Sequence, residues 1–474
     1  MSTATWTAAG HDSCAADSAR VMFRRALTLV LMTLLVPGSA QLVMGSTRVG
    51  RLAVRIWLAV LVSVALLMAM AFFNRGTVFT LATSPTFLWV ARAGVTILGA
   101  GWALLFLDAW RLGSPLDLRR THRLVMTGLS SAMCVVTAGS LFFSAHLMAV
   151  QQDFMATVFG SNVVSLADAG RYNVLLLGGD SGDGRVGLRP DSLSVASIDA
   201  ETGRTVLVGL PRNLADVPFP EGSVMHEQFP HGFDCEGCYL NGVNTWAEDH
   251  KELFPGVKEP GMTATKQAIE EATGLRINYY AMVNLAGFES LVDAVGGVRI
   301  HVPEDVPIGG IGAPVTGYVK AGTRVLDGKE TLWFARSRVA NNDYSRMARQ
   351  KCVMSAMLQQ LDPRTVAFNV QQIAASSKQM LSTDLPRSEL DTFMELALQA
   401  RAAKVSAVSI VPPAIDTYDP DYDKVRRMVD KTIARSESSA AAGDGSARRK
   451  RLAAKPDKAR AAAVNATKDL SSVC

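Results

Sequence analysis

The sequence carries little net charge for its length. Its 48 Lys and Arg residues nearly balance 43 Asp and Glu residues, which leaves +5 over 474 residues. Bulk electrostatics therefore gives no sign of nucleic-acid binding, and the sequence has no DNA-reading motif, so nucleic acid is not an expected partner. Internal repeats are also lacking. Basic residues matter here by position rather than by number.

Cysteine is scarce, with six residues divided between two regions. Cys14 and Cys134 lie before or inside the apolar part, and the other four follow it: Cys235, Cys238, Cys352 and Cys474. In an oxidising compartment the later four predict two disulfides. The CxxC spacing of Cys235 and Cys238 would also suit zinc, but no second close pair completes a zinc site.

Apolar residues are concentrated before about Val150. Three stretches reach the length of about 20 residues that a membrane span needs: Ala53–Phe73, Phe87–Leu107 and Leu124–Ala145. A fourth, Ala26–Val43, is broken by Pro37-Gly38. We therefore expect a membrane domain over residues 1–150 with about three spans and one short re-entrant or interfacial segment. A cleaved signal peptide is not expected, since no convincing small-residue cleavage site follows the first apolar run.

The positions of the arginines predict the orientation. Arginines flank the broken fourth stretch on both sides, and four more lie in the loop between the second and third spans: Arg111, Arg119, Arg120 and Arg123. Both groups favour the cytoplasm. Three crossings then place everything after Val150 outside a bacterial plasma membrane, whereas four would place it inside. We expect three, and thus a multi-pass protein with an extracytoplasmic domain.

The rest of the chain alternates strand and helix patterns after a linker over 151–171. Short apolar runs predict strands, and longer periodic segments ending at Gly or Pro predict helices. The expected strands are Asn173–Leu177, Leu193–Ile198, Thr205–Leu210, Ile277–Val283, Val298–Val302 and Val405–Val411. The expected helices are Thr263–Thr273 with Thr263 as N-cap, Leu285–Val295, Lys329–Ala335, Tyr344–Leu361, Thr365–Met380 and Ser388–Ala400. This pattern predicts an α/β domain over residues 172–432.

Residues 433–474 are rich in Ala, Ser, Lys and Arg and have almost no large apolar side chains. Such a segment buries too little surface to offset chain entropy, so we expect a disordered basic tail. Its run Arg448–Arg451 is either solvated, which we favour, or in contact with anionic wall polymer or lipid.

A Gly-rich loop in LLLGGDSGDGRVGLRPDS joins the first two expected strands. Asp180 and Asp191 lie at its two ends, with Arg185 and Arg189 between them. Mg²⁺ prefers one or two carboxylates together with phosphate oxygens and water, so these two aspartates are candidate metal ligands. Arg212, at the end of the third strand, is expected at the same edge. The alternative is that the loop is only a turn.

Arginine recurs in FARSRVANNDYSRMARQ. Arg346, Arg349 and Gln350 have the spacing of one helix face, and Arg336 and Arg338 precede them. Guanidinium groups bind phosphate oxygens in pairs, so converging arginines suit a pyrophosphate. The alternative is a solvated face paired with Asp343 or Glu330. Together with the Gly-rich loop, these arginines indicate a metal-assisted phosphoryl site.

The motifs NVLLLGGDS, LRPDS, GLPRN, INYYAMVNLAGFESLVDAVGGVRIHVPE, LDGKETLWFARSR and NDYSRMARQK occur together over Tyr172–Leu361. In order and spacing they resemble the LytR-CpsA-Psr family, and the stretch to about Val429 is similar to its actinobacterial members. The resemblance implies a central twisted mixed sheet flanked by helices, with an apolar pocket for a polyprenyl chain. Residues of the type of Phe288, Leu291, Val292 and Val295 are candidates for lining that pocket, with core packing as the alternative for each.

The resemblance also implies an activity: transfer of a glycan from a polyprenyl-pyrophosphate carrier to peptidoglycan or a surface-protein acceptor, leaving a phosphodiester. Carried over by position, Asp180 and Asp191 hold Mg²⁺. The phosphate-binding residues are then Arg189, Arg212, Arg336, Arg338, Arg346 and Arg349, with Gln350 beside them. Asp191 and Asp343 are candidate bases. Alternatives are a pyrophosphatase acting on lipid-linked pyrophosphate and a non-catalytic scaffold that binds polyprenyl phosphate.

Three positions depart from the family pattern. Gly182 stands where an arginine is usual, with Arg185 as its possible replacement, Asn213 replaces an aspartate and Pro190 replaces a Ser or Thr. Lys351 stands where a second glutamine is common, a change expected to be harmless. We also expect Cys352, on the arginine-bearing helix, to bond to Cys235 or Cys238.

Overall fold

The computed structural model describes residues 8–73, 81, 84–159, 163–179, 190–310, 313–338, 343–360, 381–403 and 405–438. The chain divides into two compact units, Met1–Asp153 and Phe154–Cys474. The division falls near the predicted end of the membrane domain at residue 150.

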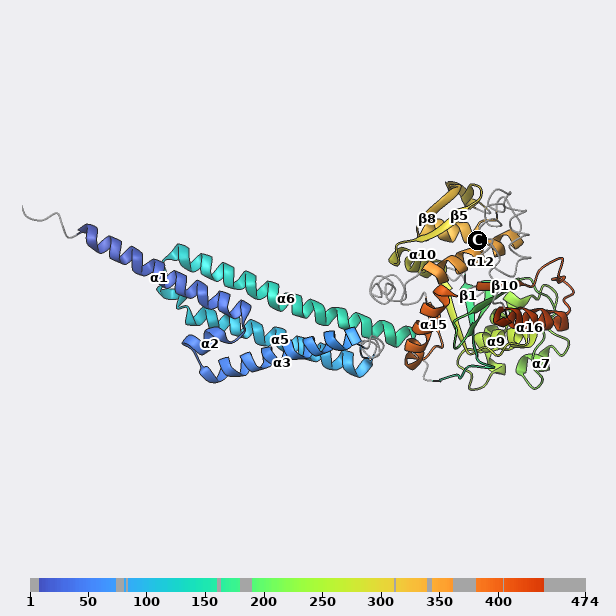
Figure 1. Ribbon diagram of the computed structural model, residues 1–474, viewed down its shortest axis with the longest axis horizontal. Helices are drawn as coiled ribbons and strands as arrows, with labels where there is room; N and C mark the ends of the chain where they lie inside the picture. Colours follow the sequence, from blue (N-terminus) through green and yellow to red (C-terminus); the bar gives the residue numbers. More distant parts are fainter. Residues whose placement is uncertain are drawn as a thin grey trace, which may run out of the picture. The chain divides into compact units, whose positions relative to one another are not determined.

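The first unit consists of helices (Figure 1). They are α1 (Ala8–Leu35), α2 (Ser39–Met44), α3 (Thr47–Phe73), α5 (Pro85–Leu112), the short 3-10 helix η1 (Pro115–Asp117) and α6 (Arg120–Val158). Among the described residues, three helices are long and apolar enough to cross a membrane: Thr47–Phe73, Pro85–Leu112 and Arg120–Asp153. These contain the three predicted spans.

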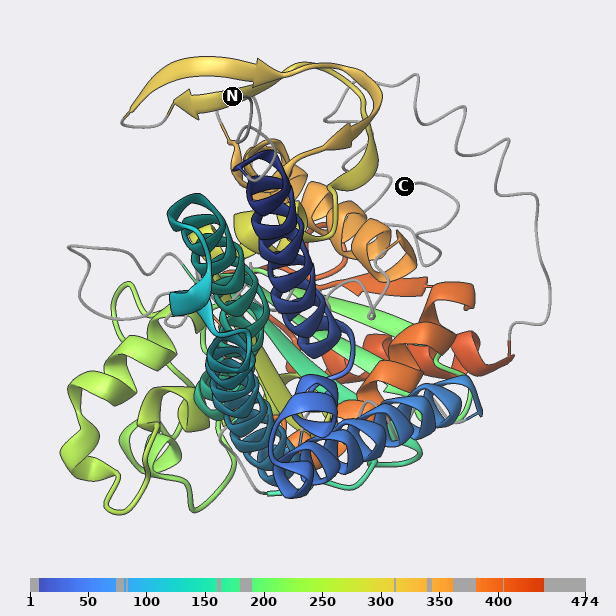
Figure 2. The ribbon, with the colours of Figure 1, turned by 90° about the vertical axis from the view of Figure 1, so that its left-hand side faces the viewer.

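The fourth apolar stretch is broken where the sequence predicts. Gly38 has a left-handed φ of 95°, and a Cβ there would lie 2.6 Å from the Ala53 Cβ, so both backbone and space require glycine. Figures 1 and 2 show α2 turning away from α1 at this break and leading into α3. The Gln41 amide donates to the Leu105 carbonyl and the Asp108 carboxylate, which ties α2 to α5.

The expected linker over 151–171 begins as a helix. Residues 151–158 continue α6, and Arg387 Nε donates to the carbonyls of Met155 and Phe159 at its end. These contacts fix the last turn of the helix, where the Met155 carbonyl also accepts a hydrogen bond from the Phe159 amide. The irregular part therefore starts later than predicted.

The second unit is built on a six-stranded sheet in the order β10-β3-β2-β1-β4-β9. Its strands are β1 (Arg171–Gly179), β2 (Pro190–Asp199), β3 (Thr205–Leu210), β4 (Tyr279–Asn284), β9 (Leu381–Thr383) and β10 (Val405–Ser409). The β1–β4 and β3–β10 pairs are parallel, and the remaining pairs are antiparallel. The predicted mixed sheet is confirmed.

Two hydrophobic cores cover the sheet, one on each face. Helix α9 (Pro260–Thr273) and α16 (Tyr422–Ser438) pack on the face that carries Leu175, Val195 and Val208. Helix α12 (Asp343–Gln360) packs on the face that carries Leu207 and Ala407. Residues facing opposite sides alternate along each strand, as the pleat requires. Figure 1 shows α9 and α16 on one side of β1, and α10 and α12 on the other.

The remaining helices are short or follow the sheet strands. They are α7 (Val224–Gln228), η2 (Leu240–Gly242), α8 (Val243–Asp249), η3 (Lys251–Leu253), α10 (Leu285–Ala294), α11 (Gly328–Arg336), η4 (Arg387–Glu389) and α15 (Leu390–Ala402). The predicted helices match α9, α10, α11, α12 and α15 to within a few residues. The expected helix Thr365–Met380 lies outside the described residues. The predicted N-cap of α9 is wrong, because the helix begins at Pro260, whereas its end at left-handed Gly274 is confirmed.

Four strands form two separate ribbons, β5–β8 and β6–β7. Their bounds are β5 (Val298–Val302), β6 (Val306–Gly310), β7 (Ala313–Val319) and β8 (Gly322–Leu326). The predicted strand Val298–Val302 is therefore a strand outside the central sheet. One face of these ribbons packs with Val292 and Phe334 into a third core.

The predicted start of disorder at residue 433 is too early. Helix α16 continues to Ser438, and Thr432 and Ser436 are buried. Arg204 Nη1 donates to the carbonyls of Ser436 and Glu437, and buried Arg171 forms an ion pair with Glu437 at 3.3 Å. These two arginines stabilise the end of a helix that composition alone does not predict. Residues 439–474 lie outside the described residues.

The cysteine pairing also differs from the prediction. Cys235 is bonded to Cys238. The expected bond from Cys352 to either of them is therefore wrong, and so is a zinc site on this pair, because both sulfurs are in the disulfide. Cys352 is buried on α12, against the core that includes Ala348 and Leu207.

Candidate functional site: an apolar cavity with a charged mouth

A cavity of about 340 Å³ lies between strands β1 and β4 and helices α10, α11 and α12. Its apolar lining comes from these five elements and from strand β9, which supplies the last residue of the set: Leu176, Leu177, Ala281, Met282, Val283, Leu285, Phe288, Leu291, Leu332, Ala335, Val353, Met354, Met357 and Leu381. Three of these are methionines, whose flexible side chains adapt to irregular ligands. A long hydrocarbon chain suits this lining.

Helices α10 and α11 form one wall because two features fix their packing. Asn284 begins α10 by accepting a hydrogen bond from the Gly287 amide. Gly328 begins α11 against the backbone of α10, and a Cβ there would lie 2.2 Å from the Glu289 carbonyl oxygen. Asp293 accepts a hydrogen bond from the Gly328 amide at 2.7 Å. The glycine thus allows the close approach that shapes the cavity.

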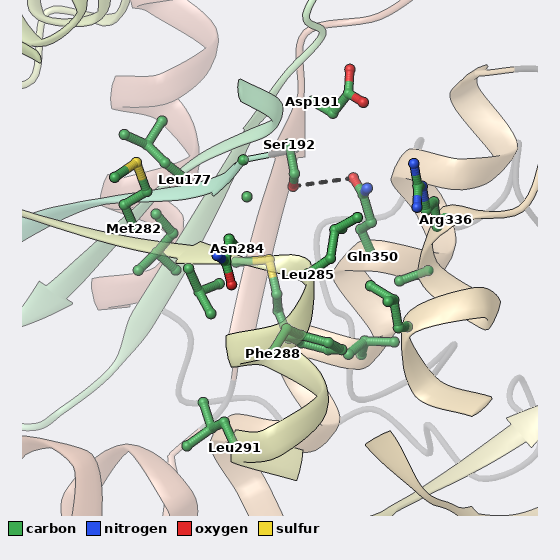
Figure 3. A pocket seen from close by; sticks show the side chains of 18 of the residues that line it. Leu177, Asp191, Ser192, Met282, Asn284, Leu285, Phe288, Leu291, Arg336 and Gln350 are labelled. Atoms are coloured by element: carbon green, nitrogen blue, oxygen red, sulfur yellow. Dashed lines mark hydrogen bonds between the residues drawn. The ribbon is translucent and has the colours of Figure 1, made fainter. Parts of the chain in front are cut away.

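Polar side chains gather at one end of the cavity. Asp191, Ser192, Arg336 and Gln350 lie together there, whereas Phe288 and Leu291 lie deeper (Figure 3). Ser192 Oγ donates to Gln350 Oε1 at 3.3 Å. Arg336, the last residue of α11, lies 5.7 Å from the centre of the Trp333 ring. The cavity is therefore amphipathic: apolar inside, with cationic and acidic groups at its mouth.

Asp191 is held by two arginines from different elements. Arg212 Nη1 donates to Asp191 Oδ1 at 2.5 Å, with both side chains partly exposed. Arg346 Nη2 donates to the Asp191 carbonyl at 3.1 Å, and Arg346 is 3% exposed. The structure thus brings Asp191, Arg212, Arg336, Arg346 and Gln350 into one region, as the sequence predicts.

Arg349 has a different position from the one expected. Its Nε donates to the Phe334 carbonyl at 2.7 Å, and its Nη2 donates to the Ser337 carbonyl. It is not among the residues that line the cavity. Arg349 therefore fixes the end of α11, where Arg336 lies, and α12 presents Arg346 and Gln350 to the cavity without it.

Other predicted site residues lie away from the cavity or outside the described residues. Arg338 follows α11, is partly buried and does not line the cavity. Asp343 begins α12, but its side chain lies outside the described part of the chain. Asp180, Arg185 and Arg189 belong to the segment between β1 and β2 that the structure does not describe.

Of the four residues that the sequence offers as candidates for lining the pocket, two line the cavity and two do not. Phe288 and Leu291 line the cavity, whereas Val292 is fully buried in the third core. Val295 follows the end of α10 and does not line the cavity. Different faces of one helix thus contribute to the cavity and to the core.

One residue of this region was missed by the sequence reasoning. Lys351 is 2% exposed, and its Nζ donates to Ser409 Oγ on β10. Burial lowers the pKa of Lys351 to about 7. The sequence marks Lys351 only as a departure from the family pattern that we expect to be harmless, because its burial depends on packing that the sequence does not show.

The described residues partly fit a magnesium ion. Asp191 supplies a carboxylate at the mouth of the cavity, and a single carboxylate with phosphate oxygens and water is a normal Mg²⁺ environment. No group of three or more His, Cys, Asp or Glu side chains able to hold a metal occurs among the residues described. A protein-only metal cage is therefore not formed by them.

Comparison with known proteins agrees with this architecture. A family model described as the LytR_cpsA_psr family matches residues 145–432, so the chain belongs to the LytR-CpsA-Psr family. The match starts within α6 and ends within α16.

Two curated relatives and one solved structure illustrate the likeness. The chain is 28% identical over 245 residues to the polyisoprenyl-teichoic acid–peptidoglycan teichoic acid transferase TagU of Enterococcus faecalis, covering 51% of this chain and 69% of TagU. It is 26% identical over 215 residues to the cell wall biosynthesis protein LcpA of Corynebacterium glutamicum, covering 40% of each. The crystal structure of TagV from B. subtilis aligns with a TM-score of 0.41 and 22% identity, over 56% of this chain and 97% of TagV.

Proposed function

We propose that the protein is a membrane-anchored phosphotransferase. It takes a glycopolymer from a polyprenyl-pyrophosphate carrier and attaches it to peptidoglycan, or to another cell-surface acceptor, through a phosphodiester. The observation that carries this proposal is the amphipathic cavity, whose apolar interior suits a prenyl chain and whose mouth carries Arg336, Arg346 and Asp191. The relative TagU, a polyisoprenyl-teichoic acid–peptidoglycan teichoic acid transferase by name, supports a polyprenyl-linked donor and a peptidoglycan acceptor.

The charges at the mouth suit a diphosphate. Arg212 and Arg346 meet at Asp191, and Arg336 approaches from α11. Guanidinium groups fixed in this way stabilise the negative charge that develops on transferring phosphoryl oxygens. A prenyl chain in the cavity would place its diphosphate beside these groups, because the polar and apolar linings meet there.

The reaction balances with one acceptor hydroxyl. The hydroxyl oxygen attacks the phosphorus on the glycan side of the diphosphate and forms a new P–O bond. The bond from that phosphorus to the bridging oxygen breaks, and polyprenyl phosphate leaves with the electron pair. The hydroxyl proton passes to a base, for which Asp191 and Asp343 are the candidates from the sequence. This chain's arginines hold the phosphates throughout.

The proposal includes a bound Mg²⁺ ion as cofactor. Asp191 would hold it, with Asp180 from the adjoining loop as the second ligand. When bound, Mg²⁺ would neutralise diphosphate charge at the reacting phosphorus. Removal of divalent cations with EDTA should therefore abolish transfer, and added Mg²⁺ should restore it.

The proposal includes a location outside the cytoplasm. Three crossings from a cytoplasmic N-terminus would place the α/β domain outside the membrane, where peptidoglycan is found. The distribution of arginines around the spans supports this orientation.

The test uses the full chain in detergent with a labelled prenyl-pyrophosphoryl glycan, a peptidoglycan acceptor and Mg²⁺. Arg212→Ala should reduce the transfer rate at least about 100-fold, since it removes a fixed cation from the developing charge. The matched control is Arg299→Ala, which changes an exposed arginine on β5 and should leave the rate unchanged.

Other outcomes separate the alternatives. Release of phosphorylated glycan that does not depend on the acceptor would identify a pyrophosphatase. Tight donor binding without any product would identify a scaffold. Neither result is compatible with the proposed transfer.

A further inference from the structure

Thr417, in the loop between β10 and α16, lies beside the charged mouth of the cavity. Two neighbouring residues after β3 show this. Arg212 donates to the Asp191 carboxylate, and the next residue, Asn213, donates from Nδ2 to Thr417 Oγ1 at 3.4 Å. Adjacent residues of a chain are only about 3.8 Å apart, so the groups that these two side chains reach are close together.

The start of α12 makes the same two connections. Tyr344 forms a hydrogen bond of 3.3 Å between its hydroxyl and Thr417 Oγ1. Arg346, two residues later, donates to the Asp191 carbonyl at 3.1 Å. The loop that carries Thr417 is therefore joined to the region of Asp191 from both β3 and α12.

The residue after Thr417 is an exposed tyrosine. Tyr418 is 65% exposed, and its ring centroid lies 6.4 Å from that of Tyr239 at an interplanar angle of 78°. Tyr239 is also tied to the charged mouth, because the Asn241 amide, two residues further on, donates to the Arg212 carbonyl at 3.1 Å. Two tyrosine rings at the surface offer apolar faces together with hydroxyl groups.

Buried neighbours fix the backbone of both tyrosines. Leu240, which follows Tyr239, is fully buried, and its amide donates to the Leu214 carbonyl at 2.9 Å. Thr417 is fully buried as well, and its carbonyl accepts a hydrogen bond from the Ala215 amide at 3.0 Å. Groups held in place before a ligand arrives lose less conformational entropy on binding. The tyrosine pair is therefore preorganised.

The loop that carries Tyr418 is acidic. Asp416, Asp419 and Asp421 are exposed, and residues 411–423 contain no Lys or Arg. Carboxylates placed around a binding surface disfavour a ligand of the same sign. A ligand on the tyrosine pair is therefore expected to be uncharged rather than anionic.

We propose that Tyr239 and Tyr418 form a platform that binds the acceptor, and that the acceptor is an uncharged glycan strand. The C–H face of a sugar ring packs on an aromatic ring while the sugar hydroxyls stay in water. The inference rests on the proposed function, because it assumes that a sugar hydroxyl attacks beside Asp191 and Arg212. Both of those side chains are partly exposed, so an acceptor can reach them from solvent. The apolar interior of the cavity is left to the prenyl chain.

Isothermal titration calorimetry with chitohexaose, an uncharged oligomer of N-acetylglucosamine, tests the platform. The full chain in detergent is titrated in the presence of farnesyl pyrophosphate, a soluble prenyl diphosphate, and Mg²⁺, so that the sugar does not compete for the cavity. Wild-type protein should bind chitohexaose, and Tyr418→Ser should bind it about tenfold more weakly because an aromatic face is lost. Tyr418→Phe keeps the ring and should bind like wild type.

The matched control is Tyr318→Ser. Tyr318 lies on β7, is 49% exposed and contacts Lys320 through its ring. Its replacement should leave chitohexaose binding unchanged. Because Tyr318 and Tyr418 are both exposed, neither substitution opens a core, and thermal unfolding of both variants should match wild type.

Two further measurements test the assignment of the ligand. Hexagalacturonate, an anionic oligomer of the same length, should bind at least about tenfold more weakly than chitohexaose. In the transfer assay, Tyr418→Ser should raise the KM for the peptidoglycan acceptor about tenfold and leave kcat and the KM for the donor unchanged, since the interaction is made equally in the ground and transition states.

The outcomes distinguish the two proposals. Equal chitohexaose binding by wild type and Tyr418→Ser, or no binding by wild type, would overturn the platform and leave the transferase proposal to its own assay. Binding that depends on Tyr418 in a protein that transfers no glycan would overturn the transferase proposal and retain a sugar-binding surface. Hexagalacturonate binding as tight as that of chitohexaose would overturn the assignment to an uncharged glycan.

Discussion

At the scale of single residues, α12 shows how neighbouring basic side chains acquire different roles. Arg346 donates to the backbone of Asp191, Arg349 donates to two carbonyls at the end of α11, and Lys351 reaches Ser409. All three are buried. Their differences come from what packs against each face of the helix, and not from residue type.

Arg349 is expected to contribute to the stability of the fold and not to ligand binding. Arg349→Met removes two charged donors and leaves the buried Phe334 and Ser337 carbonyls without them. Hydrogen bonds from charged groups contribute about 1.5–3 kcal/mol each, so the free energy of unfolding should fall by several kcal/mol. Thermal unfolding of the full chain in detergent should show a midpoint lower by at least about 4 °C.

The control for this change is Arg299→Met, at an exposed position on β5, which should unfold like wild type. If Arg349→Met kept the wild-type midpoint but no longer bound farnesyl pyrophosphate, Arg349 would be a ligand-binding residue, as the sequence alone suggests.

At the scale of elements, α16 continues beyond residue 433, where composition predicts that disorder begins. Its last residues have small and charged side chains, but Ser436 packs inward and Arg204 binds the carbonyls of Ser436 and Glu437. Burial of Arg171 lowers its pKa, while Glu437 and Asp199 act against that shift. The ends of β1 and β3 thus hold the last turn of α16.

A pair of substitutions within 433–438 tests this turn. Ser436→Lys places a charge at a position that is 5% exposed and should lower the unfolding free energy by about 1–3 kcal/mol. Ala434→Lys makes the same residue at an exposed position and should have almost no effect. Equal unfolding midpoints for the two variants would mean that disorder begins at 433, as composition predicts.

At the scale of the whole molecule, the number of crossings decides where the α/β domain works. With all three candidate spans crossing, as proposed, the loop around η1 and the α/β domain would lie on opposite sides of the membrane. Because the proposed acceptor is outside the cell, the transferase proposal depends on this topology.

Cysteine labelling in intact cells measures the topology. A membrane-impermeant maleimide should label Glu201→Cys, in an exposed turn between β2 and β3. It should not label Leu116→Cys, which is 80% exposed in η1, until the membrane is permeabilised. The unsubstituted chain gives the background. The reverse labelling pattern would place the domain in the cytoplasm and would contradict the proposal.

Much of the architecture was predictable because it depends on local pattern. Runs of apolar residues predict the spans, since a bilayer requires a length and not a partner. Strands β2 and β3 follow from short apolar runs, and the end of α9 at Gly274 follows from the conformational freedom of glycine. The convergence of Asp191, Arg212 and Arg346 was predictable because strand ends and a following helix meet at one edge of a sheet. The ribbon strands β6, β7 and β8 were not predicted, since their short, Gly-rich segments carry a weak pattern.

By itself, then, the sequence determined the anchor, the α/β class and the set of arginines and aspartates available to the site. Only the tertiary structure decided which of them face the cavity: Arg346 and Gln350 do, whereas Arg349 binds the end of α11. It also decided that Cys235 bonds to Cys238 and that Lys351 is buried beside the arginines. The physical reason is that hydrogen bonding and burial of a side chain depend on groups brought close by packing, which separation along the chain does not reveal.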